Sequence, residues 1–246
     1  MYSCYSVFKL SLIFGDFNLS QFIAVGFAIF LDVTMIIYTL WVISLEDKGG
    51  SLSASMGIGM LFWLALLHFG LTTKNIFPSD MGGAAFLLIV FMAVGAVGAL
   101  LLLVPTIRQR LLALNQKQLL LMQGIRVFFG ANFLMQASLG GLPPMFAILD
   151  GWTHIAAGFF GLIAAFTLAA DADGMRRAWF ANIFGLADIL VVVCTLSIFL
   201  LPTITPYHSI MYAVFLPAPL WLWFHLVSIW KLLQGEKIIG NQETLA

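Results

Sequence analysis

Apolar residues form seven long stretches along this chain, and short segments rich in charged residues and turn formers separate them. The stretches cover approximately residues 20–44, 52–73, 82–106, 118–138, 152–170, 178–202 and 208–233. A helix needs about 20 mostly apolar residues to cross the hydrocarbon core of a bilayer. Each stretch is long enough to do so. The pattern therefore predicts an all-α fold, an integral membrane bundle of seven transmembrane helices.

The composition agrees with a membrane protein and argues against several other classes. The 246 residues are 62% hydrophobic and 9% charged, whereas soluble domains carry about 25% charged residues. Eleven basic residues balance eleven acidic ones, so no nucleic-acid partner is predicted and the lipid bilayer is the expected partner. The chain contains neither a P-loop motif nor a Gly-x-Ser-x-Gly elbow. Neither a nucleotide site nor an enzymatic activity is predicted.

The chain reads as a single domain over residues 1–246, with two segments that do not cross the membrane. Residues 1–19 are too short and too interrupted to span, so we expect them to lie in the membrane interface. The segment 139–151 contains Gly140-Gly141 and Pro143-Pro144 but is otherwise apolar. We expect it to form an external loop that folds back over the end of the bundle.

The distribution of basic residues between the apolar stretches predicts the orientation of the chain. Only Lys9 and Lys74 lie on one side, whereas the other side carries eight: Lys48, Arg108, Arg110, Lys117, Arg176, Arg177, Lys231 and Lys237. Loops rich in lysine and arginine remain cytoplasmic. The N-terminus is therefore predicted outside and the C-terminus in the cytoplasm, in a multi-pass protein of the cell (inner) membrane.

Arg126 lies in the middle of the fourth apolar stretch, where a charge is costly. An arginine at the centre of a bilayer costs about 2.5–3.5 kcal/mol on insertion scales, so it should face acidic partners on other helices. Asp32 in the first stretch and Asp188 in the sixth lie at comparable depth, and Gln123 is one turn before Arg126. His225, deeper toward the cytoplasmic side, could extend the site. Two carboxylates beside one guanidinium would leave a net negative charge, so one of them is expected to bind a proton.

Three interpretations of these residues remain open from the sequence. In the first, Asp32, Gln123, Arg126, Asp188 and His225 form the relay of a proton- or ion-linked transporter or permease-like protein. In the second, the charges form a static pair that fixes helix register. In the third, the chain is an accessory subunit of a larger complex, with other membrane subunits as partners.

Three histidines in the outer half of the predicted bundle suggest a different chemistry. His68, His154 and His208 lie on three different stretches, and histidines at one depth can bind a divalent metal or haem b. The protein would then be a membrane redox protein. Gly158 and Gly161 share a helical face with His154 and would give a porphyrin room, although such a face also permits close helix packing. Neither a Cys-x-x-Cys-His nor a His-Glu-x-x-His motif is present.

A set of short motifs in the fourth and fifth stretches and the loop between them carries a resemblance to other proteins. The motifs are Gln123-Gly124-Ile125-Arg126, Leu142-Pro143, Phe146-Ala147 and Gly151-Trp152-Thr153-His154, with His225 later in the chain. This pattern resembles a group of uncharacterised small multi-pass bacterial membrane proteins. The group more often has an acidic residue where His154 stands. The resemblance implies a bacterial origin and assigns no function.

Overall fold

A computed structural model describes residues 19–45, 51–73, 77, 80–168, 172–204 and 208–234, the side chains of 19–21, 51–53 and 172 excepted. The predicted interfacial segment 1–19 lies outside the described residues apart from Leu19. Every regular element within the described part of the chain is a helix. Seven of these helical segments are long and apolar enough to cross a membrane. The prediction of an all-α, multi-pass membrane protein is therefore confirmed.

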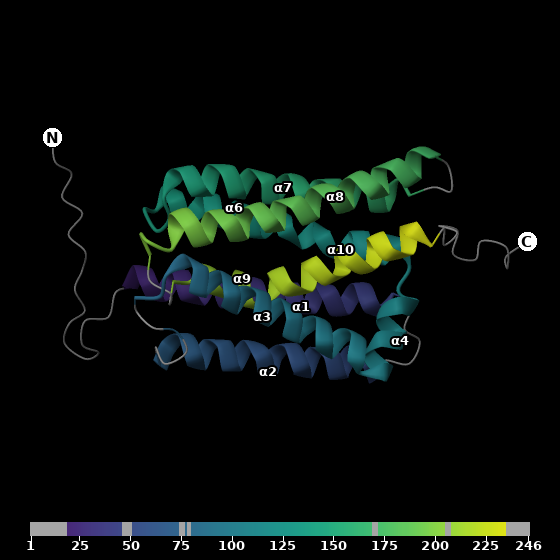
Figure 1. Ribbon diagram of the computed structural model, residues 1–246, viewed down its shortest axis with the longest axis horizontal. Coiled ribbons are helices and arrows are strands. Elements are labelled where there is room, and N and C mark those ends of the chain that lie inside the picture. The colour runs from purple at the N-terminus through teal and green to yellow at the C-terminus, as the bar shows by residue number, and fades with distance from the viewer. Residues whose placement is uncertain are drawn as a thin grey trace, which may run out of the picture.

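The seven spans run side by side along the long axis of the molecule (Figure 1). The first three are α1 (Leu19–Ser44), α2 (Ser51–Thr73) and α3 (Gly83–Leu103). The fourth combines α5 (Gln116–Leu121), the 3₁₀ segment η1 (Met122–Ile125) and α6 (Arg126–Ser138). The fifth is α7 (Pro144–Phe166). The sixth joins α8 (Ala172–Thr195) to the π-helical segment η2 (Leu196–Leu200), and the seventh joins α9 (Ile210–Phe215) to α10 (Pro217–Leu233).

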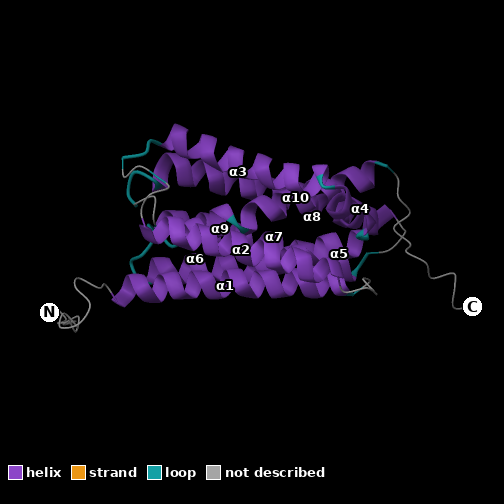
Figure 2. Cartoon of the chain, turned by 90° about the horizontal axis from the view of Figure 1, so that it is seen from below, coloured by secondary structure: helices purple, strands orange, loops and turns teal. Residues whose placement is uncertain are grey.

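The short helix α4 (Pro105–Ala113) lies at one end of the bundle, together with the last turns of α7 and α10 (Figures 1 and 2). We call this the α4 end. The opposite end carries the connection between α6 and α7 and the start of α9, and we call it the His208 end. The fourth and seventh spans are the most buried of the seven, so the core of the bundle surrounds them.

The fourth span begins earlier than predicted and is not a uniform helix. Its first turn is closed by a capping box, in which the Asn115 side chain accepts from the Gln118 N–H and the Gln118 side chain accepts from the Asn115 N–H. The 3₁₀ segment η1 then ends immediately before Arg126. Short 3₁₀ stretches inside longer helices often mark hinges or strain. The irregularity therefore lies beside the residue that carries the buried charge.

The seventh span is interrupted at Leu216, whose φ and ψ of −116° and −67° depart from helical values. Pro217 and Pro219 follow it and have no N–H to donate to the carbonyls one turn earlier. Pro219 leaves the carbonyl of Phe215 without its helical partner, and Trp63 Nε1 donates to that oxygen at 2.8 Å. The second span thus stabilises the break in the seventh.

The fifth span differs from the prediction at its start. Residues 144–151 were expected in an external loop, but α7 begins at Pro144 and only residues 139–143 remain as a connection. Proline is favoured in the first turn of a helix because its missing N–H is not needed there, and Gly140 takes the positive φ of 74° at the preceding turn. His154 consequently lies well inside α7 rather than near its outer end.

The glycine face of α7 packs directly against the fourth span. A Cβ added to Gly158 would lie 2.9 Å from the backbone nitrogen of Val127, and one added to Gly161 would lie 3.0 Å from the Leu120 carbonyl oxygen. Only glycine permits this separation. This face therefore accommodates a neighbouring helix, and it leaves no room for a flat ligand.

Candidate functional site

Arg126 is the centre of the buried polar residues in this protein. Its side chain is fully buried, and its Nη2 donates to Oδ2 of Asp188 in a buried ion pair. Its Nη1 donates to the Gly185 carbonyl oxygen at 3.1 Å and lies 3.4 Å from Gln123 Oε1. The predicted partnership of Arg126 with Asp188 and Gln123 is therefore present. Pairing offsets much of the cost of burying each charge.

His154 belongs to this same site. Its Nδ1 lies 2.6 Å from Asp188 Oδ2, the oxygen that also accepts from Arg126. The imidazole is enclosed by the rings of Phe133 and Trp221, with ring centroids 5.4 and 5.8 Å away. The sequence placed His154 in an outer layer of histidines because the start of the fifth helix was predicted too late. We call Arg126, Asp188, His154 and His225 the central cluster.

His225 contacts Arg126 from the opposite side and has a defined tautomer. Its Nε2 lies 3.0 Å from Arg126 Nη1. A guanidinium has only donors, so Nε2 must accept and the ring must be neutral. The proton is then on Nδ1, which donates to Asn182 Oδ1 at 3.0 Å. The Trp221 ring covers the guanidinium at 5.4 Å and adds a cation–π contact.

A chain of neutral polar side chains continues from His225 toward the α4 end. Asn182 Nδ2 donates to Ser228 Oγ at 2.7 Å, and Gln116 Nε2 donates to the same hydroxyl oxygen. All three side chains are buried. We call Asn182, Ser228 and Gln116 the inner chain. Sequence reasoning missed it because neutral residues in apolar stretches stand out far less than charges.

Asp150 is a second acid close to the central cluster, and sequence reasoning also missed it. It lies one turn before His154 on α7, is fully buried, and interacts electrostatically with Asp188. Its Oδ2 accepts a hydrogen bond from Thr195 Oγ1 at 2.9 Å. Because the predicted external loop included position 150, this carboxyl group was not expected inside the bundle.

Buried polar side chains also continue toward the His208 end. Gln136 Nε2 donates to Asn132 Oδ1 at 3.2 Å, and Ser209 Oγ donates to Gln136 Oε1 at 3.4 Å. These three side chains come from the fourth span and the start of the seventh and are buried. Polar groups therefore occur along the bundle interior on both sides of the central cluster.

Asp32 does not join Arg126. It is fully buried, and neither of its carboxylate oxygens has a hydrogen-bond partner among the described residues. It interacts electrostatically with Tyr212 on α9, whose hydroxyl lies 2.7 Å from His68 Nδ1. We call these three residues the Asp32 cluster. The prediction that the first helix supplies a carboxylate to Arg126 is corrected: α1 packs so that its acid meets α9 instead.

The structure separates the three histidines that suggested a metal or haem. His68 contacts Tyr212, His154 contacts Asp188, and His208 Nε2 contacts the Gly141 carbonyl oxygen at 3.0 Å. No group of three potential metal-binding side chains gathers within the described ranges. These residues therefore do not fit a metal ion or a haem clamped between histidines.

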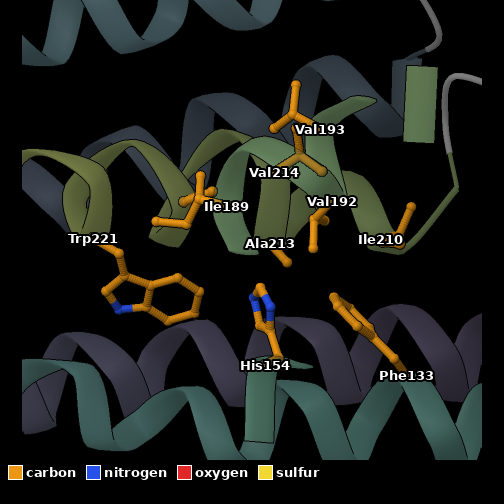
Figure 3. A pocket seen from close by; sticks show the side chains of 10 residues that line it. Phe133, His154, Ile189, Val192, Val193, Ile210, Ala213, Val214 and Trp221 are labelled. Atoms are coloured by element: carbon orange, nitrogen blue, oxygen red, sulfur yellow. The ribbon is translucent and has the colours of Figure 1, made fainter. Parts of the chain in front are cut away.

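A small pocket adjoins His154, whose ring points into it between Phe133 and Trp221 (Figure 3). Its volume is about 20 Å³, which is room for one water molecule and far too little for a porphyrin. Ala213 also lines the pocket. The carbonyl oxygen of Ala213 receives no helical hydrogen bond from position 217, because Pro217 has no N–H.

Several polar atoms of the site lack hydrogen-bond partners although they are buried. Within the described part of the chain these include Asp188 Oδ1, Asp150 Oδ1, Arg126 Nε, Gln123 Nε2 and Trp221 Nε1. Buried polar atoms in folded proteins are nearly always satisfied, so each exception requires an explanation. The site therefore has spare hydrogen-bonding capacity that its own side chains do not use.

The fold and the site together define a multi-pass α-helical membrane protein with a charged cluster at its centre. A family profile described as "Domain of unknown function (DUF8737)" matches residues 84–233, which is more than half of the chain. The chain belongs to this family. Comparisons with functionally curated proteins and with solved structures find no match. The matched region contains the whole central cluster and the inner chain, whereas Asp32 and His68 precede it.

Proposed function

We propose that this protein is a proton-linked secondary transporter in which the Asp188–Arg126 ion pair opens when Asp188 is protonated. The observation that carries the proposal is the direct contact of a buried ion pair with two histidines on different helices. Ionisable residues inside membrane-spanning segments are costly and commonly mark proton or ion pathways.

The charges of the site leave a place for one exchangeable proton. Arg126 neutralises Asp188, and His225 is neutral because its Nε2 accepts from the guanidinium. Asp150 is then the uncompensated acid, and it shares the environment of Asp188 and His154. Two interacting carboxyl groups and a histidine titrate as a unit. One proton held by Asp150, His154 or Asp188 brings the site to zero net charge.

Protonation of Asp188 would change the contacts of Arg126. The neutral acid is a weaker acceptor, so the guanidinium is released to bind another anion. Arg126 begins α6 immediately after the 3₁₀ segment η1, and a local irregularity of this kind can act as a hinge. The proposal thus couples proton binding to a movement of α6 relative to α5.

Spare hydrogen-bonding capacity supports a functional role over a purely static pair. A pair that only fixed helix register would be most stable with every buried polar atom satisfied. Several buried polar atoms around this pair, Asp188 Oδ1 and Arg126 Nε among them, have no hydrogen-bond partner among the described residues. Polar side chains continue from the pair toward both ends of the bundle. This arrangement suits a polar species that enters and leaves the site.

We infer the orientation from the charges at the two ends. Six basic residues of the described chain belong to the α4 end: Arg108, Arg110, Lys117, Arg176, Arg177 and Lys231. By the positive-inside tendency this end is cytoplasmic, with the N-terminus outside. The proton would then enter near Asp150 and leave on the side of the inner chain. The motifs that resemble small bacterial membrane proteins lie within the family match, and we place the protein in a bacterial inner membrane.

The test uses purified protein in sealed lipid vesicles that contain a pH-sensitive dye. After a pH difference is imposed in the presence of a panel of small ions, the wild-type protein should carry protons for at least one of them. Asp188→Asn and Asp150→Asn should each reduce this flux by tenfold or more because neither amide can take up the proton. Both substitutions preserve the shape of the side chain.

Asp173→Asn is the matched control. This aspartate is exposed at the α4 end, where it pairs with Arg176 on the surface, so the proton flux of the variant should equal that of the wild type. Asp32→Asn should also retain flux, because Asp32 lies outside the central cluster. Wild-type vesicles that hold the pH difference as tightly as empty vesicles under every ion condition would contradict the proposal.

A further inference from the structure

A second, larger pocket lies away from the central cluster, between α2 and α3. Its volume is about 370 Å³ and its wall is almost entirely apolar. The residues of α2 that line it include Met56, Gly59 and Trp63, and α3 contributes Val97 and Leu100. Although α2 and α3 are consecutive in sequence, α2 packs mainly against α1 and α9 and makes little contact with α3. The pocket occupies the space that this separation leaves.

The size of the pocket decides between a helix and a single chain as its occupant. One turn of an α-helix, with a diameter of about 10 Å and a pitch of 5.4 Å, fills roughly 420 Å³. This exceeds the pocket volume, so the pocket cannot enclose a helix of a partner, which could place only side chains in it. The volume lies in the range typical of small-ligand sites. An extended hydrocarbon chain is the species in a bilayer that matches both the shape and the apolar wall.

The positive charge at the α4 end indicates which headgroup the bound molecule carries. Ile107 of α4 lines the pocket, and its neighbour Arg108 is exposed beside it, with Arg110 exposed two residues later. Arginines at the membrane surface attract anionic lipid headgroups, each by about 1 kcal/mol. An apolar cavity that is lined by the same helix that carries the exposed Arg108 is complementary to a molecule with a hydrocarbon chain and a phosphate.

We propose that the pocket between α2 and α3 binds one anionic phospholipid, with an acyl chain against Trp63 and Gly59 and the phosphate at Arg108. The pocket is also lined by Leu216 and Leu220, two buried residues that flank the two prolines of the seventh span. The lipid therefore rests on the helix break whose carbonyl Trp63 stabilises. The proposal does not depend on the proposed transport function, because no residue of the central cluster lines this pocket.

Native mass spectrometry of the protein, released from micelles containing equal amounts of phosphatidylglycerol and phosphatidylcholine, tests the site. The wild type should retain one phosphatidylglycerol in preference to phosphatidylcholine. Gly59→Phe should abolish retention, because a side chain at position 59 meets no atom within 4 Å and would extend into the pocket. Gly26→Phe is the matched control: it is equally unobstructed but lies on α1 outside the pocket.

The headgroup is tested separately. Arg108→Gln should lower the ratio of retained phosphatidylglycerol to phosphatidylcholine about fivefold, which corresponds to the contribution of one surface arginine. Arg176→Gln, an exposed arginine elsewhere at the same end, should leave the ratio unchanged. Equal retention by the wild type and Gly59→Phe, with both monodisperse, would overturn the chain site. An unchanged ratio in Arg108→Gln, or retention of an uncharged lipid alone, would overturn the anionic assignment.

Discussion

Asp188 and Asp32 are both buried carboxyl groups inside membrane-spanning helices, but their surroundings differ. Asp188 touches Arg126 and His154, whereas Asp32 has no hydrogen-bond donor among the described residues and interacts with the Tyr212 hydroxyl. A buried carboxylate without a partner is far more costly than a neutral acid. We therefore expect Asp188 to be ionised at rest and Asp32 to be protonated. Position in an apolar stretch does not determine the charge of an acid; its neighbours do.

The two acids also lie in different parts of the molecule. In the fourth and seventh spans, which hold Arg126 and His225, 72% of the apolar stretch is buried, against 33%, 33% and 22% in the first three spans. The family match begins at residue 84, so it includes the four most buried spans together with α3 and leaves out α1 and α2. The central cluster belongs to the part of the chain that defines the family. The Asp32 cluster joins that part to the two spans that precede it.

The largest effect should come from removing one member of the ion pair. Arg126→Met leaves the buried Asp188 without its guanidinium partner and with only His154 beside it. Breaking a buried ion pair by removing one partner costs about 3–5 kcal/mol. Asp188→Leu should cost a similar amount because it leaves the arginine unpaired. The double variant Arg126→Met/Asp188→Leu should recover most of the stability while remaining inactive in transport. Thermal unfolding in detergent and proton flux in vesicles measure the two properties.

Recovery of stability without recovery of flux would separate the functional role of the pair from its role in folding. If the double variant were as active as the wild type, the ion pair would be only a register device. If the double variant were less stable than both single variants, the pair would not be the interaction that the single substitutions disrupt.

The second prediction concerns the inner chain, where we expect an effect of intermediate size. Asn182→Leu removes the acceptor of His225 Nδ1 and the donor to Ser228, and an unsatisfied buried group costs about 1–3 kcal/mol. Asn182→Asp keeps the acceptor, and its carboxylate should favour a second proton on His225 in the state in which protonation of Asp188 has released Arg126 from His225 Nε2. Transport by Asn182→Asp should therefore shift its pH profile, whereas a purely structural role for Asn182 would leave the profile unchanged. His225→Gln should show no such shift when combined with Asn182→Asp.

A smaller effect of opposite sign is expected at Asp32. Replacing an unpaired buried acid by an apolar residue removes a desolvation cost, so Asp32→Leu should be neutral or stabilising by about 1 kcal/mol. The same change at position 188 should be strongly destabilising. Thermal unfolding of the two leucine variants side by side compares the two environments directly. A loss of several kcal/mol in Asp32→Leu would show that Asp32 has a charged partner after all.

The sequence alone predicted the seven helices and the buried pair of Arg126 with an acid, which is one half of the site. Lengths of apolar stretches predicted seven spans, and the cost of a buried guanidinium predicted that Arg126 would find an acid. Apolar periodicity cannot show which helices adjoin, because every face of a membrane helix can be apolar. For that reason Asp32 and Asp188 were equal candidates, although α1 directs its acid to α9.

The remaining errors have a local cause. Apolar residues between Leu139 and Gly151 were assigned to a loop because two prolines and two glycines interrupt them, but Pro144 occupies the first turn of α7. That displacement of the helix start moved Asp150 from the expected external loop into the bundle, and it moved His154 from the outer end of the fifth helix to a deeper position. Proline at the start of a helix and proline in a loop look alike in sequence. Here the assignment of Pro144 decided where Asp150 and His154 were expected.

The smallest effect concerns His208, which anchors the start of the helix that carries Tyr212. Its Nε2 donates to the Gly141 carbonyl oxygen at 3.0 Å, and its Nδ1 accepts from the Ile210 N–H at 3.2 Å. Burial lowers the pKa of His208 below its ordinary value of 6.5, and the hydrogen bond to Gly141 opposes this only in part. The folded protein therefore prefers the neutral ring. Below pH 6.5 the unfolded chain binds the proton more readily, so stability is lost as the pH falls toward the folded-state pKa.

The loss should be small, because the ring is only partly buried. His208→Gln keeps a donor to Gly141 but cannot titrate, so its unfolding temperature should fall less than that of the wild type between pH 7 and pH 5. Tyr212→Phe serves as a control, because it alters the Asp32 cluster and leaves the titrating ring in place. If His208→Gln and the wild type lose the same stability between pH 7 and pH 5, His208 is not the group whose protonation destabilises the protein in acid.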